Sequence, residues 1–85
     1  MPWDETAAKS FGLALRRLRE TRGLTQESLA FQAGVTKNQV QIIEAGRASG
    51  RRDCTAPSNP RMSTLVGLAG VLQMSVSEML RETGM

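Results

Sequence analysis

The 85-residue chain has no histidine, no tyrosine and one cysteine, and its aromatic content is only 4%. Without histidine it lacks the commonest general base, proton shuttle and metal ligand. Cys54 has no second cysteine to pair with, so neither an internal disulfide nor a cysteine-based metal site can form. The sequence also contains no Gly-rich phosphate loop followed by Lys and Ser or Thr. These absences argue against an enzyme, a metal ion or another cofactor.

Long apolar runs are also missing. No stretch approaches the ~20 residues needed to cross a bilayer, and the acidic start Met-Pro-Trp-Asp-Glu does not resemble a signal peptide. We therefore expect a cytoplasmic protein without membrane contact, in which Cys54 is incidental rather than a redox or intermolecular disulfide site. The length predicts one small domain, residues 1–85, with an aliphatic core.

The net charge of +3 is unevenly distributed along the chain. Residues 16–61 carry nine basic and four acidic side chains, a net charge of +5, whereas residues 1–15 and 62–85 each carry −1. A central concentration of cations is typical of a surface that binds a polyanion. Arginines that only keep helix surfaces soluble would give the same count.

Apolar residues recur at helical spacing through most of the chain, which predicts an all-α protein. The first helix is expected over residues 7–22, because Gly23 then provides a left-handed end. The second is expected over 26–33 and the third over 37–45, with Thr25 and Thr36 as N-caps.

Two further helices are expected after a long loop over residues 47–59, which lacks apolar periodicity. Asn59 and Pro60 predict an N-cap and a first helical residue, so the fourth helix would run from Pro60 to about residue 72. Ser75-Val76-Ser77-Glu78 is a capping box that opens a fifth helix, to about residue 82.

The segment 26–45 has the pattern of a helix-turn-helix. Gly34 falls where the connecting turn requires a positive φ, which glycine adopts without steric cost. The spacing also places five apolar residues on the inner faces of two crossing helices: Leu29, Ala33, Val35, Val40 and Ile43. In such a unit the second helix enters the major groove of DNA.

With its flanks, this segment resembles the Cro/C1-type (XRE) helix-turn-helix family over roughly residues 11–81. The resemblance is carried by Leu18-Arg19, Gly23-Leu24-Thr25-Gln26-Glu27-Ser28-Leu29-Ala30, Gly34-Val35-Thr36, Glu44-Ala45-Gly46-Arg47, Pro60, Thr64-Leu65 and Val76-Ser77-Glu78-Met79-Leu80. It implies a compact five-helix lambda-repressor-like domain. It also implies a transcriptional regulator, of the repressor kind, that binds a palindromic operator in double-stranded DNA as a homodimer.

The resemblance makes 37–45 the recognition helix. Since Val40 and Ile43 face inward, the expected base contacts are the residues that face outward or lie at the rim: Thr36, Lys37, Asn38, Gln41 and Ile42. Lysine can donate to guanine, and Asn or Gln can pair with adenine. Ile42 either contacts a thymine methyl group or packs under the following loop.

The resemblance also assigns residues outside this helix. Gln26 and Arg47 are expected at DNA phosphates, and Arg61 is a further candidate. Arg19 and Glu44 are expected to form a structural ion pair rather than to contact DNA.

The chain departs from the family at residues 48–57, where about ten residues replace a usual linker of a few. This insertion is a solvated loop, an arm that contacts phosphates or the minor groove through Arg51 and Arg52, or part of a dimer contact. The apolar residues Met74, Val76, Met79, Leu80 and Met85 either contribute to a subunit interface or simply close the small core.

A different function class fits the same residues. An antitoxin of a toxin–antitoxin pair would bind a small protein partner and also regulate its own promoter. Co-purification with a second small protein would distinguish it from a regulator that acts alone.

Overall fold

The structure is a computed structural model that describes residues 4–47 and 60–82. These residues form five helices: α1 Glu5–Thr21, α2 Gln26–Ala33, α3 Lys37–Ala45, α4 Met62–Val71 and α5 Val76–Arg81. The all-α class predicted from the sequence is confirmed. No described helix has the length and apolar character needed to cross a membrane. The predictions for Arg51, Arg52, Cys54 and Met85 lie outside the described residues.

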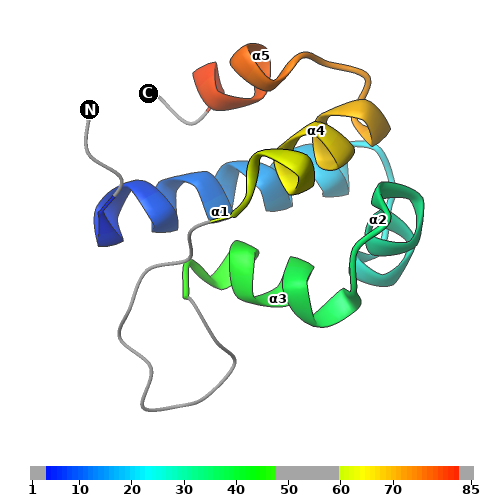
Figure 1. Ribbon diagram of the computed structural model, residues 1–85, viewed down its shortest axis with the longest axis horizontal. Coiled ribbons are helices and arrows are strands. Elements are labelled where there is room, and N and C mark those ends of the chain that lie inside the picture. Colours follow the sequence, from blue (N-terminus) through cyan, green and yellow to red (C-terminus); the bar gives the residue numbers. More distant parts are fainter. Residues whose placement is uncertain (1–3, 48–59, 83–85) are drawn as a thin grey trace.

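The long helix α1 runs through the middle of the arrangement (Figure 1). Helix α3 packs against α1, α2 packs against both α3 and α4, and α5 packs against α4. In the view of Figure 1, α3 lies on one side of α1 and α5 on the other. One side of α3 is therefore left uncovered by the other described helices.

Helices α2 and α3 have the predicted bounds, because strong local signals mark each end. The Thr25 hydroxyl accepts a hydrogen bond from the Ser28 amide at 3.0 Å. At α3 the capping is reciprocal. The backbone amide of Gln39 donates to the Thr36 hydroxyl, and the backbone amide of Thr36 donates to the Gln39 side-chain oxygen, both at 3.1 Å. Both helices end at a glycine with positive φ, Gly34 and Gly46.

The predicted start of the fourth helix is wrong by two residues. Helix α4 begins at Met62, and Arg61 is its N-cap, in an extended conformation without a side-chain capping bond. The first helical hydrogen bond joins the Leu65 amide to the Arg61 carbonyl at 3.0 Å. Pro60 therefore lies before the helix rather than at its first position. The extended backbone of Arg61 separates Pro60 from the first helical residue, Met62. Proline therefore does not occupy the first helical turn, the position that it often prefers.

The core is aliphatic, as predicted, and draws on all five helices. Its fully buried large side chains are Phe11, Leu15, Leu29, Leu68, Leu72, Met79 and Val40. Of the five predicted inner-face residues, Leu29, Val40 and Ile43 are buried, and Ala33 and Val35 pack against the core while partly exposed.

The core also accounts for the apolar residues near the C-terminal end. Met79 is buried, and Met74, Val76 and Leu80 are partly buried against the same cluster. Core closure is therefore the explanation that the structure favours for these four residues.

Two glycines allow helices to approach closely. A Cβ atom at Gly12 would lie 2.5 Å from the backbone oxygens of both Ile43 and Glu44, so α1 and α3 are in backbone contact there. A Cβ atom at Gly67 would lie 2.6 Å from the Ala33 oxygen, which brings α4 against the end of α2. Each of these two positions has room for the hydrogen atom of glycine but not for the Cβ atom of another residue.

Candidate nucleic-acid interface

Helix α3 is divided into a buried side and a polar outer side. Val40 and Ile43 are buried in the core. The outer positions at which base contacts were predicted are exposed at Thr36, Lys37, Asn38 and Gln41, and Ile42 is half-buried. The loop that would cover Ile42 in the alternative interpretation lies outside the described residues.

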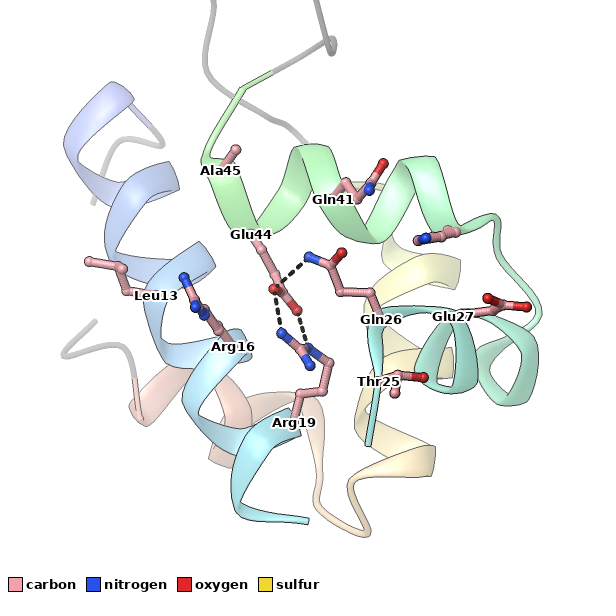
Figure 2. A pocket seen from close by; sticks show the side chains of 10 residues that line it. Leu13, Arg16, Arg19, Thr25, Gln26, Glu27, Gln41, Glu44 and Ala45 are labelled. Atoms are coloured by element: carbon pink, nitrogen blue, oxygen red, sulfur yellow. Dashed lines mark hydrogen bonds and ion pairs between the residues drawn. The ribbon is translucent and has the colours of Figure 1, made fainter. Parts of the chain in front are cut away.

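A network of side-chain hydrogen bonds fixes the end of α3 to α1 (Figure 2). The predicted Arg19–Glu44 pair is formed, with Nε to Oε2 at 2.7 Å and Nη2 to Oε1 at 3.1 Å. The side chains are only 11% and 5% exposed. The third guanidinium nitrogen, Nη1, donates to the Leu24 carbonyl at 2.8 Å. Hydrogen bonding to Glu44 raises the pKa of Arg19, whose guanidinium group is a cation at physiological pH even without this shift.

Gln26 joins this network, a contact that sequence reasoning missed. Its side-chain Nε2 donates to Glu44 Oε1 at 3.0 Å, so the first residue of α2 is tied to the last turn of α3. From the sequence, Gln26 is expected only at a DNA phosphate. The signal that could have indicated the contact is the position of the two residues, at the start and the end of the helix-turn-helix.

A hollow of about 710 Å³ opens between α1, the start of α2 and α3; we call it the α1–α3 groove. It brings together three of the predicted DNA contacts: Gln26, Lys37 and Gln41. Arg16 of α1 also lines it, although the sequence analysis assigned this residue no role. Arg47 and Arg61 are exposed elsewhere, after α3 and before α4.

Among residues 4–47 and 60–82, no group of three His, Cys, Asp or Glu side chains is placed to hold a metal ion. The functional groups that the exposed outer residues of α3 offer are a hydroxyl at Thr36, a cation at Lys37 and amides at Asn38 and Gln41. These groups suit recognition by hydrogen bonds and charge.

The family model described as helix-turn-helix domain matches residues 10–81. No curated protein matches the chain.

Three solved structures that share this fold are those of regulators. The restriction-modification controller protein C.AhdI from Aeromonas hydrophila is 32% identical, with a TM-score of 0.69 over 85% of this chain and 94% of that one. The master regulator for biofilm formation SinR, solved in complex with DNA, is 27% identical, with a TM-score of 0.66 over 82% of this chain and 97% of that one. The clp gene regulator ClgR from Corynebacterium glutamicum, 24% identical, has a TM-score of 0.72 over 92% of this chain and 72% of that one, a likeness of fold.

The chain therefore belongs to the helix-turn-helix domain family, in its Cro/C1 (XRE) type. This family is one of DNA-binding regulators, and the chain is not an enzyme.

Proposed function

We propose that the protein is a cytoplasmic transcriptional regulator that binds a specific sequence in double-stranded DNA and represses the promoter that contains it. The observation that carries this proposal is the division of α3. Its inner side is fixed by the core and by the Arg19–Glu44 pair, while its outer side presents the exposed polar residues Lys37, Asn38 and Gln41. A helix held in this way can enter a major groove without first having to be ordered.

In this proposal the outer residues of α3 read bases. Lys37 donates to guanine, Asn38 and Gln41 pair with adenine, and Thr36 and Ile42 contact groove edges, Ile42 at a thymine methyl group. The exposure of the four polar side chains supports their assignment, and Ile42 is half-buried beside them.

Residues outside α3 bind phosphates in the proposed complex. Gln26 stands at the start of α2, and the bond to Glu44 orients its side chain. Arg47 and Arg61 are exposed cations at the ends of α3 and α4 that face solvent. Such contacts fix the register of the protein on the duplex without selecting a sequence. Arg51 and Arg52 of the insertion are further proposed contacts.

We propose that two copies bind a palindromic operator and meet through the outer side of α4. Met62 and Val66 lie one turn apart on this helix and are 65% and 55% exposed. No residue from Met62 to Val71 is charged. A two-fold interface places the same surface on both subunits, so an uncharged apolar side fits a second copy without charge repulsion. This location differs from the C-terminal residues considered from the sequence, which support the core.

Selection of bound duplexes from a random pool tests the proposal. We expect a palindromic consensus with half-sites about 34 Å apart, or one helical turn. Gln41→Ala should relax preference at one position per half-site, with a loss of about 1–3 kcal/mol in binding free energy. Gln32→Ala is the matched control, because Gln32 is exposed on α2 and bonded to Ser28. A pool that shows no enrichment at moderate salt would refute sequence-specific binding, and an enriched but asymmetric site would refute the two-fold dimer.

A further inference from the structure

Helix α1 carries three arginines within about one turn, and each has a different environment. Arg19 is buried and bonded to Glu44 and Leu24. Arg17 lines a small hollow of about 160 Å³ together with Glu82, beyond the end of α5. Arg16 lines the α1–α3 groove. Adjacent residues on a helix point about 100° apart, so Arg16 and Arg17 belong to different sides of α1.

The Arg16 side chain is available for a new partner. It is 60% exposed, and the partner that the structure gives it is Glu20, at 3.5 Å and 54% exposed. An exposed pair at this spacing on a helix holds its members weakly, so a stronger acceptor can replace Glu20.

The acidic groups that line the groove do not offset Arg16. Glu44 already accepts hydrogen bonds from Arg19 and Gln26. Glu27 also lines the groove, but in Figure 2 its carboxylate points away from Arg16. The groove beside the outer side of α3 is therefore edged by a cation from α1, and Lys37 of α3 contributes another to its lining.

We propose that Arg16 binds a phosphate of the duplex backbone, so that α1 forms part of the DNA interface beside α3. A guanidinium group matches the oxygens of a phosphate with two parallel hydrogen bonds, which an ammonium group cannot do. The assignment rests on the proposed function, and it adds a residue that the sequence analysis did not include. The phosphate belongs to the DNA backbone rather than to a free anion, because the groove opens beside the residues proposed to read bases.

The experiment measures duplex affinity as a function of salt for the full chain. The probe is the consensus duplex recovered by selection, titrated at salt concentrations between about 50 and 200 mM. The variants are Arg16→Gln, Arg17→Gln and Arg16→Lys. Arg17→Gln is the matched control, since it removes the same charge from the neighbouring position on the same helix.

We expect Arg16→Gln to weaken binding to all duplexes alike and to flatten the slope of log K against log salt by about 0.9. The ratio of the wild-type binding constant to that of this variant should then fall about threefold between the lowest and the highest salt concentration. Arg17→Gln should leave the slope unchanged. Arg16→Lys should keep the slope while losing part of the affinity, because the charge remains and the paired hydrogen bonds do not.

Each other outcome has a separate meaning. Equal slopes for the Arg16→Gln and Arg17→Gln variants would reduce the effect to net charge and overturn the assignment. A changed base preference in Arg16→Gln would also overturn it, because phosphate contacts carry no sequence information. Competition by millimolar inorganic phosphate at constant ionic strength would identify a free-anion site instead. A wild-type chain that prefers no duplex would refute the proposed function itself. This result would be seen with the wild-type chain alone, before any variant is measured.

Discussion

Helices α3 and α5 begin with the same local signal but are held in place by different means. Each opens with a reciprocal capping box, Thr36 with Gln39 and Ser75 with Glu78. Helix α3 is then fixed from afar, by Arg19 from 25 positions earlier in the chain and by the close approach of Gly12. Helix α5 contacts mainly α4, its neighbour in sequence, and buries Met79. A cap thus decides where a helix starts, whereas its orientation comes from distant contacts.

Of the variants considered, the one that removes the Glu44 carboxylate should lose the most stability. Glu44→Ala leaves Arg19 almost buried without its carboxylate and leaves Gln26 without its acceptor. We expect a loss of about 4 kcal/mol in the free energy of unfolding, measured by urea denaturation. Glu27→Ala, at an exposed position of α2, should cost less than about 0.5 kcal/mol. Similar losses in the two variants would mean that the pair does not hold α3.

The close backbone contact can be tested separately from the charge. Gly12→Ala places a methyl group against two backbone oxygens of α3, which cannot rotate aside as a side chain would. We expect a loss of about 2–3 kcal/mol in the free energy of unfolding. Gly70→Ala is the control within α4, where nothing lies within 4 Å of the new methyl group. It should stabilise the protein by about 0.5–1 kcal/mol, because alanine is the better helix former. If both variants gained stability, the α1–α3 contact would have to be looser than described.

The smallest effect should come from the local cap of α5. Ser75→Ala removes the hydroxyl that accepts from the Glu78 amide at 3.0 Å, with an expected loss of about 1 kcal/mol in the free energy of unfolding. Ser63→Ala, exposed on α4, should change little. A loss as large as that of Glu44→Ala would remove the distinction between α5 and α3.

The same variant has a pH signature. The Ser75 backbone amide, and then its hydroxyl, hold the pKa of Glu78 below its ordinary value. A depressed folded-state pKa adds stability above the unfolded-state pKa, and this is lost as the pH falls through the folded-state pKa. Ser75→Ala should therefore raise the pKa of Glu78 only part of the way, because the backbone amide at 2.9 Å remains. Titration followed by NMR measures this shift, and an unchanged pKa would exclude the hydroxyl as a cause.

Much of the fold could be predicted because its signals are local. The bounds of α2 and α3 follow from Thr25, Thr36 and the glycines after each helix. The end of α4 carries no such signal, since its left-handed residue is Gln73 (φ 58°) rather than a glycine. The predicted start of α4 was wrong because a proline indicates that a helix begins nearby, but not at which residue its hydrogen bonding begins.

The candidate site could be predicted in part for the same reason. Once Val40 and Ile43 are assigned to the core, the outward residues of α3 follow from helical periodicity. The bond between Gln26 and Glu44 and the place of Arg16 in the α1–α3 groove depend on how three helices cross. The positions of Gln26 and Glu44, at the start and the end of the helix-turn-helix, indicate the first contact, but no pattern along the chain indicates the second. The roles of Arg51 and Arg52 remain predictions from the sequence.

The residues that anchor α3 and those on its polar outer side are different, and this has a practical consequence for redesign. The residues that anchor this helix, Val40, Ile43 and Glu44, share no position with Lys37, Asn38 and Gln41 on its solvent side. Those three polar positions can therefore be randomised together in a library while the scaffold stays intact, and the survivors sorted for new target sites.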